Sequence, residues 1–317
     1  MVKLKDITNK LFSGISTADS KKGLSVGLDE LIEMRRYVSY LKADHAHKTY
    51  SSQSGDIKSV FKGRGIEMEE IRPYQFGDDV RDIEWKMTAR KNVPYTKVYQ
   101  EERDHQIYVW LDLSPRMLFG SIKELKSVTA AKITALLGWA ALDNNDRFGC
   151  VIFDGQHSIV FKPKRDRVYL AAVLKKISEI SKAALKNVTD DATLRFKSLK
   201  RLQMEAKNKA NVFIISSFYD WTEDNDRELA MLAQKTRLFM INVVDPLEIH
   251  APAAGQYMAE YQGQKLVFDS SSKAYQKNYS AYFEQIKKEK QNFCRRFKCQ
   301  LIDFNLEKGY RSQLKIF

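Results

Sequence analysis

The pattern of apolar and polar residues changes near residue 104. Beyond that point, short apolar runs alternate with segments whose apolar residues recur at helical spacing. Strands are predicted at 107–113, 148–153, 212–216, 238–244 and 300–304, with a shorter edge strand at 158–161. Helices are predicted at 122–142, 168–180, 194–207, 227–234 and 273–297. This alternation predicts an α/β fold in which helices flank a mostly parallel sheet.

The first hundred residues follow a different pattern. A helix is predicted from about Asp29, which can cap it, and its apolar stripe contains Leu31, Ile32, Met34, Val38 and Leu41. Residues 63–103 are dense in charge but too rich in aromatic residues for a linker. We therefore expect an N-terminal extension of helical and irregular β structure over residues 1–103. An α/β domain over 104–317, with an inserted excursion near 246–268, should follow.

Length and composition agree with two parts and place the chain in the cytoplasm. The 317 residues exceed the usual size of a single core. No stretch approaches the roughly 18 consecutive apolar residues of a membrane span, and the first residues lack the pattern of a signal peptide. Three cysteines without a CxxC pair favour a reducing compartment over a disulfide framework.

Positive charge is concentrated at the C-terminal end. The net charge is +13, and residues 273–317 contain eleven Lys/Arg against four Asp/Glu. A basic helix at 273–298 fits nucleic acid, an anionic membrane or an acidic protein, but it fits a solvated helix surface equally well. No nucleic-acid-binding motif accompanies the charge.

The sequence contains no recognisable catalytic motif. There is no GxxxxGK[ST] phosphate loop, and the five histidines are scattered. A hydrolase using Asp78 or Asp79 as a base is the enzymatic alternative, but no nucleophile or cofactor motif accompanies these carboxylates. We therefore expect a non-enzymatic protein without a cofactor.

A polar turn ends the first strand of the predicted sheet. Asp112 and Ser114 form the first half of a DxSxS pattern, whose oxygens suit a hard ion such as Mg²⁺. Arg116 takes the place of the second serine and brings a permanent positive charge without a lone pair. Two interpretations follow. Either Arg116 stands in for the cation and pairs with Asp112, or it points to solvent while the turn caps the following helix.

A second polar constellation lies within residues 63–103. Its members are Arg72, Tyr74, Gly77, Asp78, Asp79, Arg81, Trp85 and Arg90. Gly77 permits a tight turn, and the charged residues are predicted to surround Trp85. The structural interpretation is a set of buried ion pairs with Trp85 fixing a small subdomain onto the sheet. The functional interpretation is a docking surface.

The stretch GRGIEMEEIRPYQFGDDVRDIEWKMTARKNVPYTKVYQEERDHQIYVWLDLS resembles the signature of the domain of unknown function 58 family. These are MoxR-associated proteins with a von Willebrand factor A-like domain. Weaker echoes are Ser216-Ser217-Phe218 after a strand and Asp245-Pro246-Leu247-Glu248, which is similar to the family's DPxE element. The resemblance implies a von Willebrand factor A-like, Rossmann-type fold.

The resemblance also implies a metal-ion-dependent adhesion site that is degenerate in this chain. Asp112 and Ser114 match its pattern, whereas Arg116 and Ser217 replace two expected oxygen ligands. Asp220 is a candidate replacement for the missing carboxylate, and Thr189 and Thr193 are alternative threonine ligands. The implied role is a partner-binding adaptor of MoxR-type AAA+ ATPases in chaperone-like assembly of client proteins. We expect its binding surface at Asp112, Ser114, Arg116, Thr189, Ser217 and Asp220, without a bridging metal.

Overall fold

A computed structural model describes residues 23–43, 68–99, 105–186, 190–219, 223–261 and 264–314. The chain divides into two compact units, one formed by Phe61–Asp104 and the other by the rest. The larger unit contains a six-stranded sheet with the order β10-β7-β6-β3-β4-β5. Its strands are β3 (Gln106–Asp112), β4 (Arg147–Phe153), β5 (Ser158–Lys164), β6 (Asn211–Ser216), β7 (Arg237–Val244) and β10 (Gln300–Asn305).

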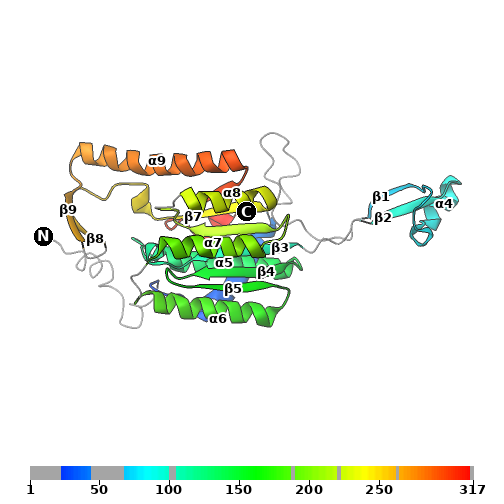
Figure 1. The fold of residues 1–317 in the computed structure, drawn as a ribbon, viewed down its shortest axis with the longest axis horizontal. Coiled ribbons are helices and arrows are strands. Elements are labelled where there is room, and N and C mark those ends of the chain that lie inside the picture. Colours follow the sequence, from blue (N-terminus) through cyan, green and yellow to red (C-terminus); the bar gives the residue numbers. More distant parts are fainter. Residues whose placement is uncertain are drawn as a thin grey trace. The chain divides into compact units, whose positions relative to one another are not determined.

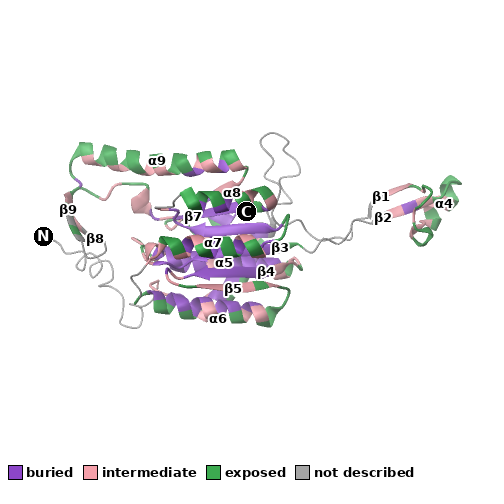
Figure 2. Ribbon diagram, viewed as in Figure 1, coloured by how far each residue is buried: buried purple, intermediate pink, exposed green. Residues whose placement is uncertain are grey.

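Five of these strands are parallel, and β5 pairs antiparallel with β4 at one edge. The central strands β3 and β6 are buried along their whole length, as expected for parallel strands covered on both faces. In Figure 2 the buried residues are concentrated in this sheet, whereas the outer faces of the helices are exposed. The prediction of an α/β fold with a mostly parallel sheet of the von Willebrand factor A-like, Rossmann type is confirmed.

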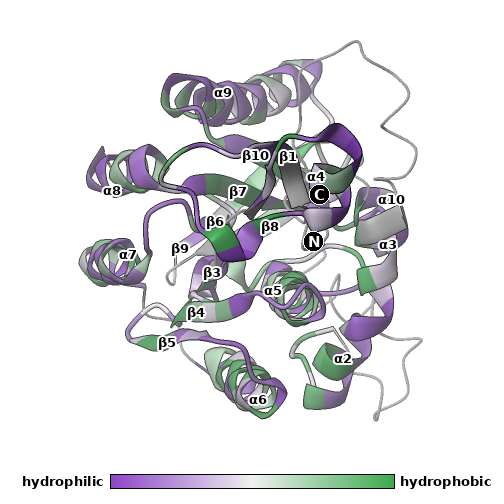
Figure 3. Cartoon of the chain, turned by 90° about the vertical axis from the view of Figure 1, so that its right-hand side faces the viewer, coloured by the Kyte–Doolittle hydropathy of each residue, from purple (hydrophilic) through white to green (hydrophobic). Residues whose placement is uncertain are grey.

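Helices cover both faces of the sheet, as Figures 1 and 3 show. The helices of one face are α5 (Lys126–Asp143) and α6 (Arg167–Ala184), together with α2 (Leu28–Glu33), η1 (Met34–Tyr37) and α3 (Val38–Ala43). Those of the other face are α7 (Ala192–Glu205), α8 (Glu223–Lys235) and α9 (Lys273–Phe297). Trp110 on β3 donates from Nε1 to Ser198 Oγ at 3.0 Å and so fixes α7 against the centre of the sheet.

The first helical segment, which was predicted as part of the N-terminal extension, packs against α5 and α6 of the larger unit. Trp139 on α5 donates from Nε1 to Leu31 O at 3.1 Å, and Ser178 on α6 donates to Val26 O at 2.8 Å. Of the predicted apolar stripe, Leu31, Met34, Val38 and Leu41 are buried, whereas Ile32 is 41% exposed. The separate unit begins only at Phe61. The predicted cap at Asp29 is wrong, because Gly27 is the N-cap and its N–H donates to Glu30.

The inserted excursion contains a short 3₁₀ turn and a hairpin. These are η5 (Pro246–Glu248), β8 (Gln256–Tyr261) and β9 (Gln264–Asp269), and β8 pairs antiparallel with β9. The hairpin contacts α9 (Lys273–Phe297) through aromatic side chains. Phe268 of β9 stacks on Tyr275 of α9, with ring centroids 5.4 Å apart. A last short helix, α10 (Tyr310–Gln313), follows β10, and the Tyr310 hydroxyl donates to Glu124 in the segment that precedes α5.

Candidate functional site

The candidate site lies at the carboxyl ends of β3 and β6. These two strands are neighbours in the middle of the sheet. On the β3 side the sheet continues with β4 and β5, and on the β6 side it continues with β7 and β10. In doubly wound sheets, ligands bind beyond the carboxyl ends of the strands, at the point where the strand order reverses. The turn after β3 contains η4 (Pro115–Met117), and the loop after β6 contains residues 217–219, hereafter the 217–219 loop.

Asp112 is buried at the end of β3, with 1% of its surface exposed. Its Oδ1 accepts the backbone N–H of Ser114 at 3.0 Å, and its Oδ2 accepts the hydroxyl of Ser216 at 2.6 Å. Both carboxylate oxygens thus have a donor from the protein. Ser114 is fully buried, and its hydroxyl has no hydrogen-bond partner within the described chain.

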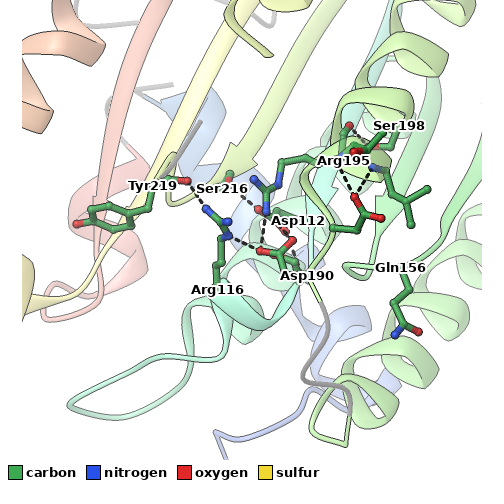
Figure 4. A network of polar contacts seen from close by, with 12 residues as sticks. Asp112, Arg116, Gln156, Asp190, Arg195, Ser198, Ser216 and Tyr219 are labelled. Carbon is green, nitrogen blue, oxygen red and sulfur yellow. Dashed lines mark hydrogen bonds and ion pairs between the residues drawn. The ribbon is translucent and has the colours of Figure 1, made fainter. Parts of the chain in front are cut away.

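Arg116 joins the turn after β3 to two other segments, as Figure 4 shows. Its Nε donates to the carboxylate of Asp190, and its Nη1 donates to the carbonyl of Tyr219 at 2.8 Å. Arg195 on α7 donates from Nη2 to both oxygens of the same carboxylate, at 2.5 and 2.6 Å. One carboxylate therefore lies between two guanidinium groups. Only 17% of the Arg116 side chain and 5% of the Asp190 side chain are exposed.

The 217–219 loop is held by cations from three elements. Besides the bond from Arg116, Lys290 on α9 donates to the carbonyl of Ser217 at 2.8 Å. Lys126 at the start of α5 and Lys290 each place Nζ 5.0 Å from the centroid of the Tyr219 ring. Phe218 has φ of +54°, a conformation that costs a bulky residue free energy and persists only where surrounding contacts hold it.

Lys126 has its own carboxylate partner in the DPxE element. This buried lysine donates to Glu248, whose other oxygen accepts the N–H of Asp245 at 3.0 Å. Asp245 in turn accepts the N–H and the hydroxyl of Ser121 at 2.7 and 2.6 Å. The buried acids at this edge therefore all have donors from the protein. In the described residues, no cluster of three or more His, Cys, Asp or Glu side chains has the geometry of a metal site.

The family model "Protein of unknown function DUF58" matches residues 70–289. The chain belongs to this family. The match begins within β1 (Met68–Pro73) of the smaller unit and ends within α9. It therefore includes the turn at Gly77, the turn after β3 and the DPxE element.

Two curated relatives of this DUF58 chain are "Uncharacterized protein Rv1480" of Mycobacterium tuberculosis and "Uncharacterized protein Mb1516" of Mycobacterium bovis. Each is 25% identical over 209 residues, which are 65% of this chain and 63% of the relative. The chain thus matches less than two thirds of the length of these relatives.

Two solved structures also align. "Conserved hypothetical protein BatB" from Bacteroides thetaiotaomicron is 13% identical, with 67% of this chain and 95% of that chain covered and a TM-score of 0.41. An "Uncharacterized Membrane Spanning Protein" from Vibrio fischeri is 14% identical, with 66% and 94% covered and a TM-score of 0.19. In the described part of this chain, no helix is long and apolar enough to span a bilayer.

Asp112 ends β3, Ser114 and Arg116 lie in the turn after it, and Ser217 follows the end of the neighbouring strand β6. Arg116, however, pairs with Asp190 and not with Asp112, and the alternative of a solvent-facing arginine is also wrong. Thr193 is exposed in the first turn of α7, where its N–H donates to the cap residue Asp191. Thr189 and Asp220 lie outside the described residues.

Sequence reasoning missed four charged residues of this site, namely Lys126, Asp190, Arg195 and Lys290. Asp190 directly follows Thr189, a candidate ligand, and this position along the chain was the signal that could have identified it as a site residue. Lys126 and Lys290 carry no signal of their own, because a lysine on a helix is usually solvated; Lys126 is one of two lysines in α5 and Lys290 one of five in α9. Only the packing of these helices shows that both side chains point inward.

The smaller unit contains β1 (Met68–Pro73), η3 (Val80–Asp82), α4 (Trp85–Lys91) and β2 (Tyr95–Tyr99). Arg72 forms two hydrogen bonds with Asp78, at 2.9 and 2.7 Å, and this bonding lowers the pKa of the Asp78 carboxyl. Gly77 has φ of +110° in the turn that brings Asp78 back to Arg72, so the predicted tight turn is confirmed.

The predicted network around Trp85 does not form. Asp79 accepts the N–H of Arg81 and caps η3, Tyr74 is half-buried, and the Arg81 and Arg90 residues are exposed. Trp85 itself is 67% exposed, and Phe76 nearby in sequence is fully exposed. Within its own unit, Trp85 therefore lacks the buried environment that the structural interpretation required.

Proposed function

We propose that this DUF58 chain is a non-enzymatic adaptor that binds a protein partner with the carboxyl-terminal edge of its sheet and without a bridging metal. The observation that carries this proposal is the contact of Arg116 with Asp190 and Tyr219. In an adhesion site the third position of DxSxS supplies an oxygen to the ion. Here it supplies a cation that already binds a carboxylate, which repels a divalent ion and leaves fewer than the roughly six oxygens that Mg²⁺ requires.

The polar groups of this edge also support a binding role. Buried unsatisfied polar atoms are rare in folded proteins, yet the Ser114 hydroxyl and the Nε and Nη1 groups of Arg195 have no hydrogen-bond partner in the described chain. An enzyme would need an accessible base beside a nucleophile. The carboxylates here instead accept hydrogen bonds from neighbouring side chains, which favours recognition over catalysis.

The partner that we propose is a MoxR-type AAA+ ATPase, which would bring client proteins to this chain. Support comes from family membership, the resemblance of residues 63–114 to the MoxR-associated signature, and the exposed Phe76 and Trp85 as a second docking surface. The test is capture of a purified MoxR ATPase by the full-length chain. Arg116→Glu should reduce capture at least about tenfold, because it replaces a charge-assisted contact with repulsion.

A matched control separates the site from general charge effects. Arg227→Glu changes the same charge on the exposed surface of α8 and should leave capture unchanged. Circular dichroism must first show that both variants are folded. Wild-type capture by Arg116→Glu and by Asp112→Ala would show that the turn after β3 is not the contact site.

The alternative is a basic-surface binder of nucleic acid or anionic membrane. The supporting observation is α9, in which only Lys290 and Cys294 are buried and most lysines and arginines are exposed. This alternative predicts an affinity for a short RNA duplex or for phosphatidylserine vesicles that falls steeply with salt. Saturable capture of the ATPase in 200 mM salt, together with no binding of the RNA duplex or of the vesicles in 50 mM salt, would favour the adaptor function.

A further inference from the structure

A cavity of about 350 Å³ lies between α8 and α9. Its inner wall is formed by buried and half-buried side chains from several elements, namely Phe218, Tyr219, Met240, Ile286, Lys290 and Phe293. Its rim is exposed and contains Asp226, Tyr282, Gln285 and Glu289. Apolar walls around a few polar groups, with a volume of this order, are typical of binding sites for small ligands and side chains.

Lys290 is the charged group of the inner wall, and only 9% of its surface is exposed. Its Nζ donates to Ser217 O at 2.8 Å and to Asn242 Oδ1 at 3.1 Å. An ammonium group has three N–H donors, so one remains. Within the described chain, no carboxylate lies in ion-pair distance of Lys290, unlike Lys126, which binds Glu248. Burial lowers the pKa of Lys290 to about 8, so the amine still carries its charge at neutral pH.

We propose that this cavity receives the side-chain carboxylate of a glutamate or aspartate from the protein partner, and that Lys290 binds it. This inference rests on the proposed function, because the occupant belongs to the partner. The carboxylates of Glu248 and Asp303 attract Lys290 from beyond ion-pair distance, so its charge is only partly compensated. A partner carboxylate in direct contact would supply the rest of that compensation and accept the remaining N–H. The apolar wall of Phe218, Ile286 and Phe293 would pack against the rest of the partner's side chain.

The rim restricts what can enter. Asp226 and Glu289 carry negative charge at the mouth of the cavity, and Gln285 donates to Glu289 at 3.0 Å. A run of acidic residues or a nucleic-acid strand would be repelled there. The geometry therefore fits a single carboxylate flanked by neutral or basic residues, which favours a peptide over a polyphosphate backbone.

The cavity and the strand-end site share the 217–219 loop. Lys290 binds the carbonyl of Ser217, and Arg116 binds the carbonyl of Tyr219 two residues later. A partner segment in the cavity would therefore contact Phe218 and Tyr219 while the same partner lies against the turn after β3. Lys290 would thus be the anchor of a surface that extends from α9 to β3.

The test uses two peptides that differ in one charge, acetyl-Leu-Glu-Phe-Lys-amide and acetyl-Leu-Gln-Phe-Lys-amide. Binding to the full-length chain, labelled with ¹³C at its methionine methyl groups, is followed by NMR. The Met240 signal, assigned with Met240→Leu, reports on the cavity wall. The glutamate peptide should shift this signal saturably and bind at least about tenfold tighter than the glutamine peptide, as expected for a charged hydrogen bond.

Three variants define the outcome. Lys290→Met should remove the preference for glutamate, whereas Lys288→Met, exposed on the same helix, should keep it. Ile286→Trp should fill the cavity and abolish binding of both peptides while the far-ultraviolet circular dichroism stays unchanged. Equal affinity for the two peptides, no saturable shift, or a preference that survives Lys290→Met would overturn the proposal. Tighter binding of an RNA oligonucleotide than of the glutamate peptide would assign the cavity to a different class of ligand.

The peptide assay contains neither the ATPase nor a change at Arg116. If the peptides fail to bind but Arg116→Glu still reduces capture of the ATPase, the proposed contact at the turn after β3 is supported and the cavity proposal is wrong. If the glutamate preference is observed but the ATPase is not captured, the cavity binds a different acidic partner and the MoxR assignment falls.

Discussion

Arg116 Nη1 and the carbonyl oxygen of Tyr219 are 2.8 Å apart, which ties the turn after β3 directly to the loop after β6. In this chain an arginine makes the connection, with Asp190 as the anion that balances it. The loops are thereby held in place by side chains of the protein itself.

The first prediction concerns the carboxylate between the two arginines. Asp190→Asn leaves Arg195 fully buried without a counter-charge, which should lower the free energy of unfolding by about 3–5 kcal/mol. Urea unfolding measures the change. The adjacent Asp191→Asn is the control, since asparagine caps a helix as well as aspartate does and the cost should stay below about 0.5 kcal/mol. Equal losses for the two variants would contradict the role given to Asp190.

The second prediction is a gain of metal binding. Arg116→Ser together with Ser217→Asp introduces the two oxygen ligands that the proposed adhesion-site pattern has at these positions. Mg²⁺ at 5 mM should then raise the thermal midpoint of the double variant, because a ligand that binds only the folded state stabilises it. The wild type and the control Arg116→Ala with Ser217→Asp should show a smaller response or none. A wild-type midpoint that rises equally with Mg²⁺ would show that Arg116 does not prevent metal binding.

The third prediction follows from the lowered pKa of Lys290, which burial brings to about 8. The unfolded chain takes up this proton nearer pH 10.4. Between pH 8 and 10 the unfolded state therefore binds more protons, and the free energy of unfolding should rise with pH by about 2 kcal/mol from this group. Urea unfolding at pH 7, 8.5 and 9.5 measures the rise, and Lys290→Met should remove it. The same slope in both proteins would mean that other groups cause it.

The fourth prediction is an order of reactivity among the cysteines. Cys299 accepts a hydrogen bond from Cys294, which lowers the pKa of Cys299, whereas burial raises the pKa of Cys150. Iodoacetamide reacts with the thiolate, so Cys299 should be alkylated first, by about tenfold or more over Cys150. Peptide mass spectrometry at pH 7.5 over a time course measures this. Earlier modification of Cys150 would contradict the arrangement at the end of α9.

Periodicity was sufficient to predict the sheet and most of its helices. The run at 107–113 is apolar throughout and corresponds to β3, because a central parallel strand is buried on both faces. The same information placed Asp112 at the carboxyl end of that strand. The antiparallel direction of β5 was not predicted, since it depends on the short turn after Asp154, where Gly155 has φ of +99°.

The partners of the site residues depend on packing that a sequence pattern does not contain. The sequence left two interpretations of Arg116 open, a pair with Asp112, its neighbour along the chain, or a side chain in solvent. In the structure Arg116 pairs with Asp190, because the hydrogen bond between Trp110 and Ser198 fixes α7 against β3 and so places the residue before its N-cap beside Arg116. Lys290 was one of seven cations in a basic helix, and only the register of α9 on β7 makes it the buried one.

The antiparallel edge strand β5 has a consequence for self-association. Pro163 removes one backbone donor from this strand, and Lys162 and Lys164 place charge on either side of it. A second copy of the chain that tried to extend the sheet here would lose a ladder hydrogen bond and bring like charges together. The edge next to α6 is thus protected against fibril-like stacking, although the core strands beside it are strongly apolar.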